Sequence, residues 1–358
     1  MKQGDKVYRY EWLVVTDARV AGSVQIEPHY SLSALMAPSE DWLEQYLILR
    51  TQEVHKLPKT SKTGKKGYYL PEGVPHELVM LASLFLGRRL TLCGLIRHDD
   101  SPLMPPLRPS LNGRRAGECV DLAETQEGFK QALGLRRDKQ THQRFIHAVR
   151  SYNQALQLVD SMPDVAYLLL VCAMEALAVF HPVEKSLADV DESLPALLKR
   201  VEDPRARGEI EQKFLAMDRS NTKKFVGFVV QHTGQSFWES RTANWGHVEA
   251  SRLPELMKDV YDYRSRFVHE SDPLPPSIYT PLPWDMDPST SVASGNRVWV
   301  RDPEAKGRRI AAGRSGSPAG YYIPQPSFMM DLANHVIMQF LKTNQEPTSD
   351  CSQPLECM

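Results

Sequence analysis

Alternating apolar and polar side chains at the start of the chain predict extended strands. In residues 8–15 every second side chain is large and apolar or aromatic, which is the period of a strand with one buried face. The residues that share this face are Tyr8, Tyr10, Trp12 and Val14. Residues 88–96 have the composition of a further strand, whereas the apolar positions of residues 40–55 fit either a helix or a strand.

A helix is predicted between these strands. Residues 75–87 are mostly apolar, begin at Pro75 and end at Gly87, the usual residues at the two ends of a helix. Before it, residues 56–70 are polar, basic and contain glycine, which favours a loop. We therefore expect residues 1–125 to form a small α+β domain.

After this region the apolar residues recur at helical spacing. Around residues 142–160 the apolar positions lie three and four residues apart, which predicts an amphipathic helix. These positions are Phe145, Val149, Tyr152, Leu156 and Val159. Residues 163–180 are apolar almost all round, as expected for the central helix of a bundle. Residues 253–269 and 326–341 return to the helical period, so the fold class is predicted to be mainly α.

The bundle is interrupted and followed by segments of different composition. Residues 271–320 are rich in proline, serine and glycine and read as an irregular insertion, with "NRVWV" at 296–300 as one strand of a hairpin. Residues 346–358 are polar and predict a disordered tail. We expect a helical bundle over residues 126–345 that contains this insertion.

Composition and charge limit the possible ligands and the cellular location of the protein. The chain has 358 residues with a net charge of -1, so nucleic-acid contacts would depend on local basic patches. Its five cysteines form no CxxC pair, which fits a reducing cytoplasm, and the first residues lack the apolar run of a signal peptide. The longest apolar run, residues 165–180, is too short to span a membrane and contains Glu175. No histidine or cysteine spacing predicts a metal or cofactor.

Two charged residues stand where the pattern predicts apolar ones. The stripe of the 253–269 helix consists of Leu253, Leu256, Met257, Val260 and Phe267. Arg264 lies within this stripe, and Glu175 lies within the most apolar helix. Because arginine and glutamate are seldom buried without a partner, we predict that the two meet, as a bidentate ion pair.

A histidine follows five residues after Arg264. On an ideal helix His269 is turned about 140° away from Arg264, so the two should not share a face. The "ESDP" sequence that follows predicts the end of the helix. His269 is therefore expected at the helix end, either exposed or against a partner chain.

These motifs carry a family resemblance. The stretch "YDYRSRFVHE", residues 261–270, resembles the RxxxxH motif of HEPN domains (higher eukaryotes and prokaryotes nucleotide-binding), and most of all the Apea-like group. Residues 145–180, with "SYNQAL" and then an apolar helix containing "EAL", resemble the first two helices of that group. The resemblance covers about residues 140–345.

The resemblance implies a bundle of four or five helices that dimerises through the 253–269 helix. It implies an endoribonuclease that works without a metal in prokaryotic defence or stress response. His269 would take the proton from a ribose 2′-OH and Arg264 would stabilise the phosphate charge, with Glu175 and Ser265 in support. The alternative is a bundle that binds RNA, nucleotide or protein without cleavage, in which Arg264 and Glu175 form a structural ion pair.

A basic loop offers a second RNA contact. Residues 55–69, "HKLPKTSKTGKKGYY", contain five lysines and no acidic residue. Lys62, Lys65 and Lys66 are candidates to follow a phosphate backbone while Tyr68 stacks on a base. The alternative is a solvated loop, the commoner role of such a charge run.

Overall fold

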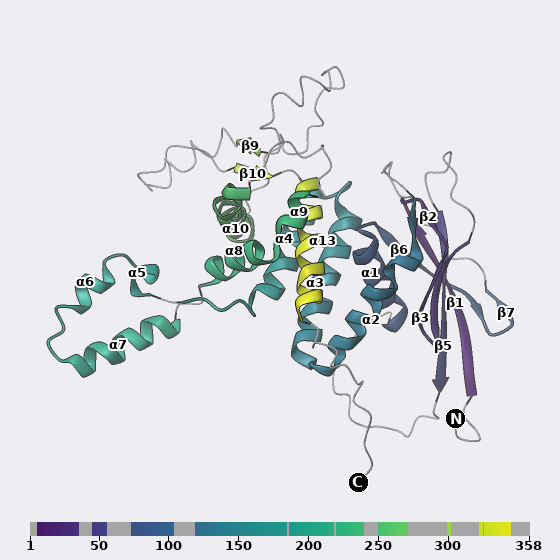
Figure 1. Ribbon diagram of the computed structural model, residues 1–358, viewed down its shortest axis with the longest axis horizontal. Helices are drawn as coiled ribbons and strands as arrows, with labels where there is room; N and C mark the ends of the chain where they lie inside the picture. The colour runs from purple at the N-terminus through teal and green to yellow at the C-terminus, as the bar shows by residue number, and fades with distance from the viewer. Residues whose placement is uncertain are drawn as a thin grey trace, which may run out of the picture. The chain divides into compact units, whose positions relative to one another are not determined.

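Helices, one six-stranded antiparallel sheet and two pairs of short strands make up the regular structure of the described residues (Figure 1). The computed structural model describes residues 6–35, 45–55, 73–103, 119–184, 186–217, 220–239, 250–270, 299–301, 322–324 and 326–344. Helices hold most of the residues in regular structure, as predicted. The chain divides into two compact units, residues 1–173 with 329–358, and residues 174–328. None of the described helices combines the length and apolar character needed to cross a membrane.

The first unit contains a six-stranded sheet. Its order is β3-β4-β5-β1-β6-β7, and every neighbouring pair is antiparallel. The strands are β1 (Lys6–Thr16), β3 (Ser23–Glu27), β4 (Tyr30–Ala34), β5 (Gln45–His55), β6 (Leu90–His98) and β7 (Ser101–Pro102). Two short strands, β2 (Val20–Ala21) and β8 (Val120–Asp121), pair in parallel.

Residues 45–55, part of the segment whose apolar positions fitted either a helix or a strand, form strand β5. β5 runs beside β1 over its whole length, from the Lys6–His55 pair to the Thr16–Gln45 pair. Alternate residues of the central strands, such as Val14, Leu47 and Leu49, are fully buried. The end of the sheet near His98 carries an aromatic stack, in which the His98 ring lies 4.8 Å from that of Tyr10.

Three helices lie beside the sheet in the first unit. They are α1 (Gly73–Leu86), α2 (Gln126–Gly134) and α3 (Lys139–Leu158), and short 3-10 turns at Leu122–Thr125 and Leu135–Arg137 flank α2. α1 packs against both β6 and α3. The predicted helix at 75–87 is thus confirmed, and Gly87 ends it with φ of 60°, a conformation that glycine adopts without strain.

α3 has the amphipathic character that its spacing predicted. Phe145, Val149, Tyr152 and Leu156 are buried. Asp138 caps the helix by accepting hydrogen bonds from the Gln140 and Thr141 backbone N–H groups. Hydrogen bonding, chiefly from the Thr141 hydroxyl, holds the pKa of Asp138 below its ordinary value.

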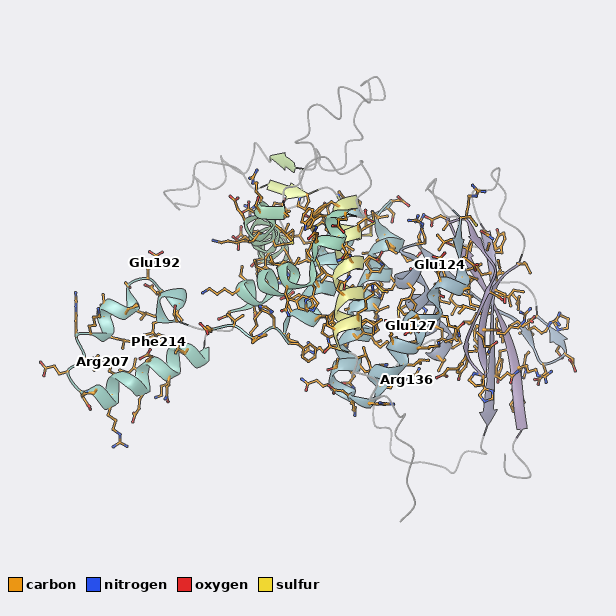
Figure 2. The ribbon with its side chains drawn as sticks, viewed as in Figure 1. Glu124, Glu127, Arg136, Glu192, Arg207 and Phe214 are labelled. Carbon is orange, nitrogen blue, oxygen red and sulfur yellow. The ribbon has the colours of Figure 1, made fainter. Side chains whose placement is uncertain are left out.

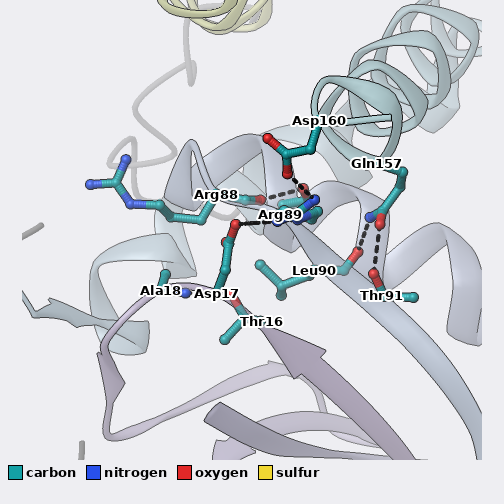
Figure 3. Close-up of polar contacts among 10 residues, drawn as sticks. Thr16, Asp17, Ala18, Arg88, Arg89, Leu90, Thr91, Gln157 and Asp160 are labelled. Atoms are coloured by element: carbon teal, nitrogen blue, oxygen red, sulfur yellow. Dashed lines mark hydrogen bonds and ion pairs between the residues drawn. The ribbon is translucent and has the colours of Figure 1, made fainter. Parts of the chain in front are cut away.

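A buried arginine forms hydrogen bonds to two other segments of this unit (Figure 3). Arg89, directly before β6, donates from Nε and Nη2 to Asp17 Oδ2 at 3.2 and 2.8 Å. Its Nη1 donates to Asp160 Oδ2, beyond the end of α3, at 2.8 Å. The Arg89 and Asp17 side chains are only 5% and 1% exposed. Arg89 therefore joins the end of β1, the start of β6 and the end of α3.

Side chains of α3 also complete the hydrogen bonding of β6. Gln157 Nε2 donates to the Leu90 carbonyl at 2.9 Å, and the Gln157 side-chain oxygen accepts from Thr91 Oγ1 at 2.7 Å (Figure 3). These bonds place α3 with the sheet, whereas the sequence predicted a domain boundary near residue 125. The compact units divide inside α4 (Pro163–Ala178) instead.

The C-terminal helix belongs to the first unit for a similar reason. α13 (Pro326–Thr343) follows the predicted helix at 326–341, and its residues from 329 onwards lie in the first unit. Asn334 Nδ2 donates to the Leu84 carbonyl near the end of α1 at 2.6 Å. The first unit is therefore assembled from an N-terminal and a C-terminal stretch of the sequence, and the residues of the second unit come between these stretches in chain order.

The second unit is mostly helical. Besides the end of α4 it contains α5 (Leu187–Val190), α6 (Leu194–Leu198), α7 (Pro204–Met217), α8 (Asn221–His232), α9 (Gln235–Glu239), a 3-10 turn at Ala250–Arg252 and α10 (Leu253–Glu270). Arg207 of α7, whose side chain is labelled in Figure 2, donates from Nε and Nη2 to the Val201 carbonyl at 3.2 and 2.7 Å. α8 packs against α10, where the Phe225 and Tyr261 rings lie 5.2 Å apart.

The strand predicted within the insertion is present. β9 (Trp299–Arg301) pairs antiparallel with β10 (Tyr322–Pro324), so "NRVWV" ends in one strand of a hairpin. The rest of the predicted insertion at 271–320 and the predicted tail at 346–358 lie outside the described residues.

Candidate functional site

Helix α10 carries the candidate site and buries the stripe that its sequence predicted. Leu253, Leu256, Met257 and Val260 are all buried, and Phe267 is half-buried. Tyr261 and Tyr263 are buried as well, so the helix turns a wider face to the unit than the stripe alone predicted. A charged residue on this face must find a partner.

Arg264 finds that partner in Glu175 of α4, as predicted. Arg264 Nη2 donates to Glu175 Oε2 at 2.8 Å, while Glu175 Oε1 accepts from the Tyr261 hydroxyl at 2.9 Å. The ion pair therefore uses one nitrogen, and the predicted bidentate arrangement is wrong because Tyr261 occupies the second oxygen. Arg264 also lies over the Tyr261 ring, with its guanidinium carbon 5.7 Å from the ring centroid.

This ion pair is partly open to solvent. The side chains of Arg264 and Glu175 are 23% and 26% exposed. Solvent screens a pair of this kind, so it stabilises the fold less than a fully buried one. Arginine carries five N–H donors, and the one on Arg264 Nε is buried, so an anion could reach only the terminal nitrogens of this guanidinium.

His269 lies in the last turn of α10 and is exposed. With 3.6 residues per turn, it is about 140° around the helix from Arg264 and about 7.5 Å further along the axis. The structure therefore places the two motif residues on different faces of one helix, as the sequence predicted. Ser265, the residue after Arg264, is half-buried.

A second tyrosine and arginine on α10 were missed by the sequence reasoning. The Arg266 guanidinium lies over the Tyr263 ring at 5.0 Å from its centroid, and Tyr263 is only 3% exposed. The Tyr261 and Arg264 pair has the same spacing of three residues, which brings side chains together on a helix. The signal was visible as two interleaved Tyr-x-x-Arg pairs in "YDYRSR".

α8, which packs against α10, contributes a buried histidine. His232 Nδ1 lies 2.9 Å from the Phe228 carbonyl oxygen and donates to it. Burial lowers the pKa of His232, and the nearby His181 acts in the same direction. His181 occupies the space beside Gly227, where a Cβ would lie 2.3 Å from its Nε2. His232 is therefore a neutral packing residue near neutral pH.

The remaining predicted site residues are not part of the described structure. Lys62, Lys65, Lys66 and Tyr68 all lie outside it. Among the residues that are described, no group of three or more histidine, cysteine, aspartate or glutamate side chains is arranged to hold a metal ion.

Comparison with known proteins found no match: no family model, no curated protein and no solved structure resembles the chain closely enough to be identified as a relative. The arrangement on α10 and α4 is thus the basis for any functional inference.

Proposed function

We propose that the protein is a HEPN-type endoribonuclease that cleaves RNA without a metal, in the cytoplasm of a prokaryotic cell, as part of defence or stress response. The observation that carries the proposal is the arrangement of α10. It presents an exposed His269 in its last turn and a partly exposed Arg264 whose position is held by Glu175 and Tyr261. The RxxxxH resemblance assigns these two residues their roles.

His269 acts as the general base. Its neutral imidazole takes the proton of a ribose 2′-OH, and the 2′-oxygen then forms a bond to the adjacent phosphorus. The bond from phosphorus to the 5′-oxygen breaks, and that oxygen leaves with a proton returned from a protonated histidine. The products are a 2′,3′-cyclic phosphate and a 5′-hydroxyl end. Arg264 stabilises the negative charge that develops on the phosphate oxygens.

The reaction requires two copies of the chain in this proposal. Because Arg264 and His269 point about 140° apart on one helix, a single copy does not direct both at one phosphate. Pairing of two α10 helices places the Arg264 of one copy beside the His269 of the other. Lys62, Lys65, Lys66 and Tyr68 then add a phosphate-binding and base-stacking segment.

One observation favours a second candidate function. Glu175 and Tyr261 engage Arg264 within one chain, which is the arrangement expected if the arginine has only a structural role. In that case the bundle binds RNA, nucleotide or a protein partner without cleaving it.

Cleavage in the presence of EDTA separates the two candidates. The purified wild type and the variant His269→Ala are incubated with tRNA and with single-stranded RNA. The control is His29→Ala, which alters an exposed histidine of the first unit. The nuclease proposal expects EDTA-resistant cleavage by the wild type and the control, a loss of at least about 100-fold in His269→Ala, and 2′,3′-cyclic phosphate ends. Equal cleavage by all three proteins contradicts it, and binding without cleavage supports the second candidate.

Oligomeric state gives an independent test. Sedimentation of the wild type at increasing concentration should show a dimer. A strict monomer that nevertheless cleaves RNA would contradict the composite site.

A further inference from the structure

Helix α3 of the first unit carries no acidic residue. Its 20 residues include three lysines or arginines and two histidines, but neither aspartate nor glutamate. In the whole chain 44 of 358 residues are acidic, so a stretch of this length would hold two or three on average. Helices α7 and α10 carry acidic residues among their basic ones. The surface of α3 is therefore more uniformly basic than that of α7 or α10.

The polar residues that α3 exposes form one stripe along the helix. They recur at spacings of three and four residues, so they share one side. They are Gln140, Gln143, Arg144, His147, Arg150, Ser151 and Gln154, each exposed or half-buried. The opposite side, from Thr141 to Leu156, is buried in the first unit. Because its apolar side is occupied, α3 has no face to insert into a membrane, and the stripe can bind only a ligand in water.

The two arginines of the stripe have no acidic partner. Neither Arg144 nor Arg150 makes an ion pair with another residue in the described part of the chain. The carboxylates that border the helix are engaged elsewhere. Asp138 accepts hydrogen bonds from the backbone of the first turn, and Asp160, beyond the last turn, binds Arg89. Both guanidiniums of the stripe therefore keep their full charge for a ligand.

Amides occupy the positions from which a carboxylate would neutralise these arginines. Gln140 lies four residues before Arg144, and Gln154 lies four residues after Arg150. Side chains at this spacing are neighbours on a helix, and a glutamate at either position would form an ion pair. A glutamine leaves the charge of the arginine unchanged. Its amide can also donate a hydrogen bond to a phosphate or sugar oxygen.

The arrangement of the two arginines fits an extended polyanion. Arg144 and Arg150 lie on the two edges of the stripe, about 120° apart around the helix axis and about 9 Å apart along it. A nucleic-acid strand that follows the stripe has one guanidinium on each side and the amides beneath it. The planar fork of arginine matches two oxygens of a phosphate, so each edge can bind one phosphate of the strand.

We propose that the exposed stripe of α3 is an RNA-binding site, separate from the candidate cleavage site, at which Arg144 and Arg150 bind phosphates of the backbone. The inference rests on the proposed function in taking RNA as the ligand. Contacts to phosphates carry no base specificity, so binding is independent of RNA sequence and weakens as the salt concentration rises. The first unit thus holds the RNA, while the second unit carries His269.

Binding of an RNA that cannot be cleaved tests this site. The probe is a fluorescent single-stranded RNA with methylated 2′-hydroxyls, which lacks the nucleophile of the proposed reaction, and fluorescence anisotropy gives its Kd. Each phosphate contact to a single strand contributes about 0.7 to the slope of log K against log salt. The double variant Arg144→Gln with Arg150→Gln should lower this slope by about 1.4 and weaken binding by about 25-fold at 0.1 M salt.

The matched control is Arg205→Gln on α7. The Arg205 Nε lies 3.4 Å from Glu209 Oε1, so this arginine is exposed but already paired with a carboxylate. The control should bind the probe as the wild type does, with the same salt dependence. The inference is wrong if the wild type does not bind the probe. It is also wrong if the double variant binds within about twofold of the control, because two lost phosphate contacts cost far more.

A variant that keeps both arginines separates ligand binding from folding. Gln140→Glu places a carboxylate four residues before Arg144, the order in which an ion pair stabilises a helix. The melting temperature, followed by circular dichroism, should stay the same or rise, whereas affinity for the probe should fall by about threefold or more. If the double variant proves less stable, the decision rests on Gln140→Glu. Unchanged affinity in this variant overturns the inference.

The site on α3 and the nuclease function can fail separately. If the wild type cleaves RNA, the double variant should raise KM and leave kcat nearly unchanged, because its arginines do not contact the reacting atoms. Cleavage with no change in KM or in probe binding removes the α3 site and keeps the nuclease. If the wild type does not cleave but the double variant loses affinity for the probe, the nuclease function fails and the α3 site stands.

Discussion

Arg89 in the first unit and Arg264 in the second both bind carboxylates, but in different surroundings. Arg89 makes three hydrogen bonds to Asp17 and Asp160, and its side chain is 5% exposed. Arg264 makes one to Glu175 and remains 23% exposed. The first guanidinium has almost no surface left for a ligand, whereas the second has both a partner and access to solvent.

The difference shows how an arginine on an apolar face can serve structure alone or structure and function together. A fully buried pair is costly to break because its remaining member keeps an uncompensated charge. A partly exposed pair loses less, since water solvates the remaining charge. The following variants test whether this contrast holds in the protein.

The largest effect is expected from Arg89→Met. Removing the guanidinium leaves Asp17 buried without its partner, which should lower the free energy of unfolding by about 3–5 kcal/mol. Urea unfolding followed by circular dichroism measures the change. The double variant Asp17→Leu with Arg89→Met should recover part of the loss, because no charge then stays buried. If Arg89→Met alone were as stable as the wild type, the hydrogen bonds of Arg89 would not contribute to the stability of the first unit.

A smaller effect is expected from Arg264→Met. Solvent reaches both members of the Arg264–Glu175 pair, so the loss should be about 1–2 kcal/mol, measured in the same way. In a double-mutant cycle, Glu175→Gln added to Arg264→Met should cost little more. A loss as large as that of Arg89→Met would place Arg264 with the structural arginines and favour the non-catalytic candidate.

Tyr261→Phe should have a weaker effect again. It removes one hydrogen bond to Glu175 but keeps the ring that packs against Phe225. The expected loss is about 0.5–1.5 kcal/mol. If Tyr261 orients Glu175, the loss should largely disappear when the same change is made in Glu175→Gln. An equal loss in both backgrounds would contradict the hydrogen bond as its source.

The smallest effect on stability is expected from protonation of His232, in the second unit, as the pH falls. Burial holds the pKa of His232 below its ordinary value of 6.5, so the unfolded chain binds this proton more readily than the folded chain. Stability should decrease as the pH falls below about 6.5 and level off below the folded pKa. His232→Asn should flatten the slope, whereas His29→Asn, at an exposed site, should not. Equal slopes in both variants would contradict the assignment.

Local patterns in the sequence were sufficient to predict most helices and one long-range contact. The helical period located α3, α4 and α10, because each buries a face whose residues recur every three or four positions. The Arg264–Glu175 pair was also predictable. Each of these charged residues lies among apolar residues on its own helix, so each needed a partner of opposite charge from another helix. The tyrosine that shares Glu175 was not predicted, because nothing in its spacing distinguishes it from a core residue.

The contacts that define the first unit were beyond sequence reasoning. Asp17, Arg89 and Asp160 come from three distant segments, and no local spacing connects them. Gln157 looks like an ordinary surface residue of a helix until β6 is known to run beside it. For this reason the predicted boundary near residue 125 separated α3 from the sheet with which it forms one unit. The period of β5 was ambiguous, and only its pairing with β1 decided it.

The discontinuous first unit has a consequence for the order of events during synthesis. Its sheet is translated first, but α13, whose Asn334 binds the end of α1, follows residues 174–328. At about 5–20 residues per second, translation of that intervening stretch takes roughly 8–30 s. During this interval the surface that α13 later covers stays open on the nascent chain. A chaperone that recognises exposed apolar segments would find its target there, on the ribosome, rather than on the finished protein.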